Sequence, residues 1–239
     1  ADTTQKLKDE INHDKKILIT YGGGSIRKNG VLKQVKEALE GFNYSEFGGI
    51  EPNPKYETLM EAVKIVKEGG YNFLLAVGGG SVLDGTKFIA AASKFEGDPW
   101  DILSKGASVV DALELADVIT LPATGSEMNC GAVISRISTK EKLPFMSEKV
   151  YPKFSIIDPK TTFSLPEKQT VNGIVDTFVH VMEQYATYDV NTPLQDQWAL
   201  GIIKTLIEEG PKVLKNPQDY NARANIFWCA TCGLNYWIS

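Results

Sequence analysis

A glycine-rich tetrapeptide, Gly-Gly-Gly-Ser, occurs twice in the chain, at 22–25 and at 78–81. Each copy follows an apolar run typical of a buried strand and precedes a segment with helical patterning. Glycines at such a turn let the backbone approach a phosphate, and the following helix offers unpaired amides. One alternative is that the glycines only make tight turns. Two such loops in one sheet favour a phosphate-containing ligand, and because neither matches Gly-x-Gly-x-x-Gly, we expect a binding mode unlike the usual Rossmann one.

A carboxylate and an imidazole, Asp176 and His180, lie four residues apart in the segment Val-Asp-Thr-Phe-Val-His. This spacing places both side chains on one face of a helix, an arrangement that suits a divalent metal. Apolar neighbours predict that the helix is largely buried, and a buried carboxylate needs a partner. Metal binding and a simple hydrogen bond between the two side chains both satisfy that need, and two ligands alone do not make a metal site.

Several other features carry weaker signals. The segment 121–127, Leu-Pro-Ala-Thr-Gly-Ser-Glu, has hydroxyl groups suited to a ribose or phosphate, but its composition is also that of an ordinary loop. Cys229 and Cys232 form a lone Cys-x-x-Cys whose apolar neighbours indicate small core residues rather than a redox or metal site. His13, among charged residues, is expected at the surface. We expect four aromatic residues in the core or in a subunit contact: Phe227, Trp228, Tyr236 and Trp237.

Strand and helix patterns alternate up to about residue 165. Near-continuous apolar runs are typical of parallel strands covered on both faces, and they predict strands at 16–21, 44–47, 72–77, 118–121 and 154–157. One intervening helix is expected to begin with Asn53 as N-cap and to end at Gly69-Gly70. Its buried stripe would consist of Leu59, Ala62, Val63 and Val66. The alternation predicts an α/β fold with a doubly wound parallel sheet.

Beyond residue 165 the pattern becomes helical. Helices are expected over 167–186, 193–209 and 218–236, separated by Gly210-Pro211 and Asn216-Pro217, because proline lacks the amide that a helix needs. We therefore expect an α/β domain at 1–164 and the first part of an all-helical domain at 165–239.

The composition is that of a folded globular protein. Of the 239 residues, 43% are hydrophobic and 23% are charged, which excludes a disordered or collagen-like chain. The net charge of −5 and the lack of a dense Lys/Arg cluster argue against a nucleic-acid partner. Apolar runs are too short for a transmembrane helix. Three cysteines and an N-terminus without an apolar signal region predict a cytoplasmic protein without disulfides.

Five motifs in order resemble the iron-containing (group III) alcohol dehydrogenases, and within them the butanol dehydrogenase and aldehyde reductase branch. They lie at 22–30, 48–54, 78–87, 121–127 and 172–180 and together cover nearly the whole chain. The resemblance implies an N-terminal Rossmann-like dinucleotide-binding domain followed by an all-helical domain, with metal and substrate between them.

The resemblance also implies a role for each matching residue. The cofactor pyrophosphate would be held by Gly78, Gly79, Gly80 and Ser81. The nicotinamide and its ribose would contact Thr120, Leu121, Thr124 and Ser126. Asp84 and Lys142 would lie near the nicotinamide as the catalytic candidates, and Asp176 and His180 would be the first two of four ligands of Fe²⁺ or Zn²⁺.

The first loop predicts which cofactor is used. Some members of the family have an aspartate there, which would repel the 2′-phosphate of NADP(H). This chain has uncharged residues instead, with Arg27 and Lys28 close behind, so we expect NADP(H) to be preferred over NAD(H). The uncharged residues are Gly22, Gly23, Gly24 and Ser25. The implied reaction is hydride transfer between NAD(P)H and a small aldehyde or primary alcohol, in a homodimer.

One departure from the family pattern stands out. The family's other two metal ligands are histidines further along the chain, but no histidine follows His180 here, and an opening strand is expected before Ala1. We therefore expect these residues to be part of a longer enzyme. One alternative is a non-catalytic nucleotide-binding fragment. The other is a polyol-phosphate dehydrogenase or a dehydroquinate-synthase-like enzyme of the same fold, for which Lys204, Lys212 and Arg223 offer basic groups but no cluster.

Overall fold

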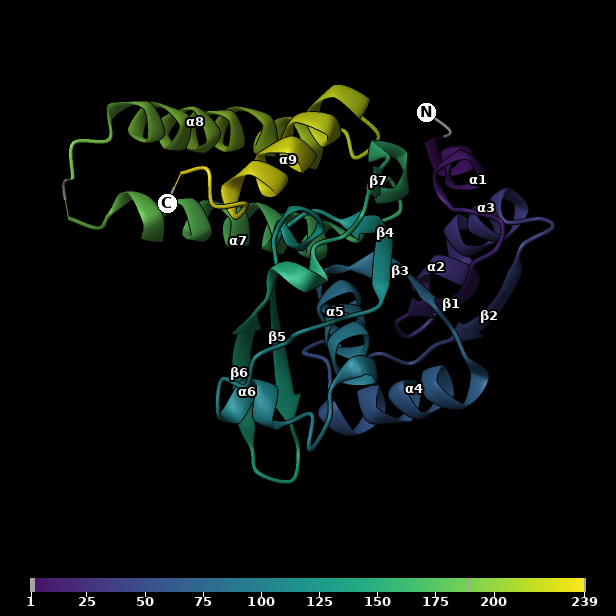
Figure 1. The fold of residues 1–239 in the computed structure, drawn as a ribbon. Helices are drawn as coiled ribbons and strands as arrows, with labels where there is room; N and C mark the ends of the chain where they lie inside the picture. Colours follow the sequence, from purple (N-terminus) through teal and green to yellow (C-terminus); the bar gives the residue numbers. More distant parts are fainter. Residues whose placement is uncertain (1–2, 189, 239) are drawn as a thin grey trace. The chain divides into compact units, whose positions relative to one another are not determined.

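The computed structural model describes residues 3–188 and 190–238 (Figure 1). Its contacts divide the chain into two compact units. An α/β unit comprises the residues up to 119 together with 130–156, and a helical unit comprises 120–129 together with the residues from 157 onward.

A five-stranded sheet with the order β2-β1-β3-β4-β7 forms the α/β unit. The strands are β1 (Lys16–Tyr21), β2 (Asn43–Phe47), β3 (Phe73–Gly79), β4 (Glu114–Leu121) and β7 (Ser155–Ile157). β1 pairs in parallel with β2, Lys16 opposite Asn43, and with β3, Ile17 opposite Phe73. All five predicted strands are confirmed, as is the α/β class. Because the chain runs outward from β1 to β2 and in the other direction from β3 to β4, the strand order reverses between β1 and β3.

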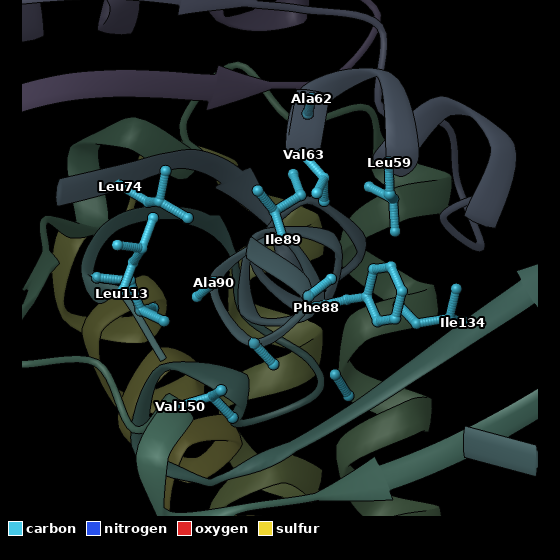
Figure 2. Packing of buried hydrophobic residues seen from close by; sticks show 14 of the residues in the cluster. Leu59, Ala62, Val63, Leu74, Phe88, Ile89, Ala90, Leu113, Ile134 and Val150 are labelled. Atoms are coloured by element: carbon cyan, nitrogen blue, oxygen red, sulfur yellow. The ribbon is translucent and has the colours of Figure 1, made fainter. Parts of the chain in front are cut away.

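Helices cover both faces of this sheet. They are α1 (Leu7–Glu10), α2 (Ser25–Lys28), α3 (Val31–Ala38), α4 (Tyr56–Gly69), α5 (Gly80–Lys94) and α6 (Asp101–Ser104), with 3₁₀ turns η1 (Thr3–Lys6) and η3 (Glu148–Val150). Successive residues of β1 point to opposite faces: Leu18 packs in the core beneath α4 and α5, whereas Ile17 and Ile19 pack in the core beneath α3. Figure 2 shows the first of these cores, where Phe88 and Ile89 of α5 are fully buried. Two buried faces explain why β1 and β3 are apolar without alternation, whereas β2, at the edge of the sheet, is polar and partly exposed.

The helix α4 confirms its predicted stripe but not its predicted start. Leu59, Ala62, Val63 and Val66 are buried, and Gly70 ends the helix in the left-handed conformation. The prediction of Asn53 as N-cap is wrong, because the helix begins at Tyr56 and Asn53 has a positive φ of 55°. An N-cap residue has extended backbone geometry, which Asn53 lacks. Its side chain therefore does not cap α4 and can bond another residue.

A β-hairpin was not anticipated from the sequence. Antiparallel strands β5 (Gly131–Arg136) and β6 (Glu141–Met146) pair with Ala132 opposite Phe145. β6 is mostly exposed, begins with two charged residues and contains Pro144, a composition that gives no apolar run and fits an edge strand.

Three long helices make up most of the helical unit (Figure 1). They are α7 (Glu167–Tyr185), α8 (Pro193–Lys215) and α9 (Tyr220–Gly233), and the unit also contains the 3₁₀ turns η2 (Ser126–Met128) and η4 (Pro159–Thr162). The predicted break at Gly210-Pro211 is wrong, because α8 continues through Pro211. Proline removes a single helical hydrogen bond, and the continued helix places Val213 in a buried cluster with Ala222 and Ile226.

The prediction that α7 is largely buried is also wrong. Its buried stripe is narrow, consisting of Thr170, Gly173, Thr177 and Val181, while Val175 and Val179 are 53% and 43% exposed. Within the described ranges, no helix combines the length and the apolar character needed to cross a bilayer.

Candidate functional site

The two glycine loops lie on either side of the point where the strand order of the sheet reverses. Residues 22–24 follow β1, and β3 ends at Gly79 directly before α5. In open α/β sheets this is where nucleotides bind, outside the carboxyl ends of the strands. The first turn of α5 has no side-chain cap, so its amides are open to an anion.

Backbone geometry explains why glycine occupies these loops. Gly24 has a φ of 100°, which side-chain-bearing residues rarely adopt, and a Cβ there would meet no atom within 4 Å. At Gly78 the reason is space, since a Cβ would lie 2.7 Å from Cγ2 of Val82. The first loop therefore leaves an open surface, and the second is closely packed on its own helix.

Asn53 links the second glycine loop to Lys142. The Lys142 ammonium donates a 2.7 Å hydrogen bond to Oδ1 of Asn53, and the backbone N–H of Asn53 donates to Oγ of Ser81 over 3.3 Å. The predicted catalytic lysine, on the exposed hairpin strand β6, is thus connected to the predicted pyrophosphate loop. Asn53 was missed as a site residue, although asparagine followed by proline in a glycine-rich loop signals an unusual backbone conformation.

Two ionisable residues of α5 bind the backbone of β5. Oδ2 of Asp84 accepts a 3.0 Å hydrogen bond from the Val133 amide, and Nζ of Lys87 donates to the Gly131 carbonyl over 3.0 Å. Lys87 is completely buried. These bonds attach the hairpin to α5, the helix that follows the predicted phosphate loop. Lys87 was not predicted, but a lysine directly before the apolar run 88–92 was its visible signal.

The predicted nicotinamide loop belongs to the helical unit. Thr120 and Ser126 are buried, Leu121 and Thr124 are half-buried, and Oγ1 of Thr124 accepts from the Ser126 amide over 3.3 Å. The hydroxyl of Thr177 on α7 bonds the Ala123 carbonyl over 3.2 Å. The loop is therefore held by the helix that carries the predicted metal ligands.

Asp176 and His180 lie on one face of α7, as their spacing predicts. Oδ1 of Asp176 lies 3.8 Å from Nε2 of His180, too far for a hydrogen bond, and the side chains are 47% and 24% exposed. Two ligands of a tetrahedral zinc ion lie about 3.3 Å apart, so a small side-chain adjustment brings both onto one metal. Nδ1 of His180 is buried and has no hydrogen-bond partner in the described part of the chain. Among the residues that the structure describes, no three or more His, Cys, Asp or Glu side chains form a cluster that would hold a metal. The chemistry of this pair fits a divalent metal, and it supplies two ligands.

The Cys-x-x-Cys pair has the properties of core residues. Burial raises the pKa of Cys229 to about 12, and burial together with the Glu127 carboxylate also raises the pKa of Cys232. Both thiols therefore resist forming the thiolate needed for redox or metal chemistry. Of the aromatic neighbours, Phe227 is buried, whereas Trp228 and Trp237 line an open hollow of about 550 Å³. His13 is exposed and stacks on Phe42, as its predicted surface position requires.

The three basic residues of the helical half do not form a phosphate site. Lys204 and Lys212 each pair with a glutamate of their own helix, and Arg223 is buried, donating to the Pro217 carbonyl and to Oγ1 of Thr170. These three residues therefore do not form a basic cluster that could bind a substrate phosphate.

The fold and these loops define a two-part scaffold, a nucleotide-type α/β unit continued along the chain by a helical unit. The chain belongs to the iron-containing alcohol dehydrogenase family, whose model matches residues 1–159, and the C-terminal model of the Fe-containing alcohol dehydrogenase family matches residues 170–235.

Similar proteins include both NADPH- and NADH-dependent enzymes. The chain is 57% identical over 232 residues to the NADPH-dependent aldehyde reductase YqhD of Escherichia coli, covering 96% of this chain and 60% of that protein. The crystal structure of E. coli YqhD matches with a TM-score of 0.97 at 55% identity, over 98% of this chain and 61% of that one. The structure of NADH-dependent butanol dehydrogenase A from Thermotoga maritima matches with a TM-score of 0.95 at 42% identity, over 99% and 60%. The chain thus spans about 60% of the length of these relatives.

Proposed function

We propose that the protein containing these 239 residues is a metal-dependent oxidoreductase that interconverts a small aldehyde and its primary alcohol with NAD(P)H. The observation that carries this proposal is that a chain of this family has two glycine loops at the switch point of its sheet and an Asp–His pair on one face of α7. The names of its relatives, an aldehyde reductase and a butanol dehydrogenase, support the substrate class.

The residues divide the work between binding and orientation. The backbone of Gly78, Gly79 and Gly80 and the hydroxyl of Ser81 bind the pyrophosphate at the start of α5, where unpaired amides favour an anion. Thr120, Leu121, Thr124 and Ser126 contact the nicotinamide and its ribose. Lys142, which bonds Asn53, and Asp84, which bonds the Val133 amide, are the catalytic candidates and would lie near the nicotinamide.

Asp176 and His180 hold the divalent metal, Fe²⁺ or Zn²⁺, together with ligands from the part of the relatives' length that these residues do not span. When bound, the nicotinamide supplies the hydride and the metal polarises the carbonyl oxygen. Both the carboxylate and the imidazole suit either metal.

A basic cluster beside the first glycine loop supports a preference for NADP(H). Arg27 bonds the Tyr21 hydroxyl and pairs with Glu46 at 3.4 Å, and Lys36 pairs with the same carboxylate at 2.8 Å. The bond from Lys36, with Arg27 nearby, holds the pKa of Glu46 below its ordinary value. Arg27, Lys33 and Lys36 line a hollow of about 330 Å³ that contains this single acidic residue. The net positive charge, next to the open surface of Gly24, favours the 2′-phosphate of NADP(H).

The remaining parts of the proposal concern assembly and location. We propose a homodimeric, cytoplasmic enzyme that acts on a small aldehyde or alcohol, without nucleic-acid or membrane partners. The three cysteines, none of them in a disulfide, fit a reducing compartment. We also propose a dinucleotide-binding domain at 1–164 and a metal-binding domain at 165–239, a functional boundary that differs from the contact-based one, which assigns 120–129 and 157–164 to the helical unit.

The test is the rate of butanal reduction with NADPH and with NADH, in metal-free protein and after addition of Fe²⁺ or Zn²⁺. We expect turnover only with metal, and a higher kcat/KM with NADPH. Asp176→Asn is expected to lose at least 100-fold in rate, while its Kd for NADPH measured without metal is unchanged. Glu208→Gln removes an exposed carboxylate of α8 and serves as the control, with unchanged rates.

Three outcomes would contradict this proposal. Turnover that survives complete chelation would exclude the metal, and a preference for NADH would refute the cofactor assignment. NADPH binding that is indifferent to Fe²⁺ and Zn²⁺, with no turnover, would indicate a nucleotide-binding fragment instead.

A further inference from the structure

The segment 120–129 continues β4 along the chain but packs with the helical unit. On one side it contacts α7. Oγ1 of Thr177 lies 3.2 Å from the Ala123 carbonyl oxygen and 2.9 Å from that of Gly173, so its single proton is shared between the loop and its own helix. At Gly173 the two backbones approach so closely that a Cβ would lie 2.4 Å from the Pro122 carbonyl oxygen. The loop and α7 therefore approach each other closely at Pro122 and Ala123.

On its other side the same segment contacts α9. Nδ2 of Asn129 donates to the carbonyls of Thr124, Gly125 and Leu234, at 3.3, 3.0 and 3.0 Å. The hydroxyl of Thr231 bonds Oε1 of Glu127 at 2.5 Å. These bonds fix the end of the loop to α9 independently of α7. At the start of the loop, by contrast, the side-chain bond to α7 comes from the Thr177 hydroxyl, which donates to the Ala123 carbonyl.

Thr177 is also adjacent to the proposed metal ligands. It follows Asp176 directly and precedes His180 by three residues on the same helix. Because α7 is hydrogen-bonded throughout, a restraint on Asp176 and His180 also restrains the intervening turn, which contains Thr177. The Ala123 carbonyl, one residue before Thr124, receives that restraint directly through the hydroxyl.

We propose that Thr177 is a positioning residue that couples the metal pair on α7 to the nicotinamide loop 120–129, so that binding at one stiffens the other. The proposal rests on the proposed function, because it requires a metal at Asp176 and His180. Ordering of a shared element by one ligand lowers the entropy cost for the second, which makes binding cooperative and reciprocal. The hydroxyl has a defined part in this coupling, since a methyl group of the same shape cannot bond the Ala123 carbonyl.

The experiment is hydrogen exchange of the protein with and without a saturating concentration of Zn²⁺, read at individual amides. In the unaltered protein we expect Zn²⁺ to slow exchange in α7 around residues 176–180 and also in the loop at 123–126, which contributes no metal ligand. In Thr177→Val the slowing in α7 should remain, while the slowing in the loop falls about fivefold, the effect of one net hydrogen bond. Thr177→Ser retains the hydroxyl and should restore it.

A matched control and a second measurement complete the test. Thr205 bonds the Gly201 carbonyl of its own helix over 2.8 Å, so Thr205→Val removes the same kind of intrahelical bond and should leave the loop effect intact. The Kd for NADPH, measured by nicotinamide fluorescence, should fall about fivefold on addition of Zn²⁺ and should not respond in Thr177→Val. If the valine variant folds poorly by circular dichroism, Thr177→Ala removes the hydroxyl without the second methyl.

The outcomes separate this inference from the proposed function. Loop slowing that persists in both Thr177→Val and Thr177→Ala would overturn the coupling while leaving the metal site in place. No effect of Zn²⁺ on α7 in the unaltered protein would overturn the metal site, and the coupling with it.

Discussion

Gly173 on α7 is the position where a single added methyl group should do most damage to the helical unit. A Cβ there would lie 2.4 Å from the Pro122 carbonyl oxygen, where real Cβ contacts are never closer than about 3.0 Å. Both the helix at Gly173 and the loop at Pro122 meet through backbone atoms, which cannot rotate away as a flexible side chain would. Loop and helix must therefore separate by more than half an ångström. The bond from Thr177 to Ala123 resists that separation.

The magnitude follows from two opposing terms. Replacing glycine by alanine inside a helix stabilises it by about 1 kcal/mol. Overpacking of a close contact costs about 1–3 kcal/mol, and a rigid backbone clash belongs at the upper end of that range. We therefore expect Gly173→Ala to lower the free energy of unfolding by about 1–2 kcal/mol.

Gly201 on α8 provides the matched control. It also lies inside a long helix, but it is exposed and a Cβ there would meet no atom within 4 Å. Gly201→Ala should therefore gain the helix propensity alone, about 0.5–1 kcal/mol. Urea denaturation at 25 °C, followed by circular dichroism, measures both variants against the unaltered protein. Equal stability of Gly173→Ala and Gly201→Ala would show that loop 120–129 does not pack against α7 as described.

Three further predictions concern other parts of the molecule. Because the pKa of Glu46 is lowered, mainly by its bond to Lys36, the pair stabilises the fold above the unfolded pKa of the carboxyl and is lost as the pH falls through the folded pKa. Glu46→Gln should thus lower the urea midpoint slightly at pH 7 and not at pH 3, and equal loss at both would contradict the ion pair. Iodoacetamide at pH 8 should leave Cys229 unmodified and label Cys232 slowly, as followed by peptide mass; rapid labelling of Cys229 would refute its burial. Phe88→Ala should cost about 3–5 kcal/mol by denaturation, since the ring is fully buried, and a cost below 1 would be incompatible with that core.

The strands and the main helices were predictable because burial leaves a direct mark on composition. Strands β1, β3 and β4 appear as apolar runs, and the stripe of α4 appears at helical spacing, since each is set by which faces meet the core. The hairpin β5–β6 left no such mark, because β6 is largely exposed and polar. Pro211 was misleading for a related reason: packing of Val213 outweighs the loss of one helical bond.

The candidate site divides in the same way. The two glycine loops and the Asp176–His180 spacing were visible in the sequence, because turn geometry and helical periodicity are local. The connections among these parts were not visible. Asn53 to Lys142, Lys87 to the Gly131 carbonyl and Thr177 to Ala123 join residues 44–89 positions apart, and nothing in a residue's type reveals a partner at that distance.

The sequence by itself thus determined the family, the strands, and the residues capable of binding a phosphate or a divalent metal, since each of these depends on local spacing and composition. Only the tertiary structure decided that the segment 120–129 packs with α7 and α9 and that α7 buries a narrow stripe. It also decided that the Asn53 side chain accepts a hydrogen bond from Lys142 instead of capping a helix. These outcomes depend on which distant backbones come close enough to exchange hydrogen bonds, and close approach is a property of the packed chain.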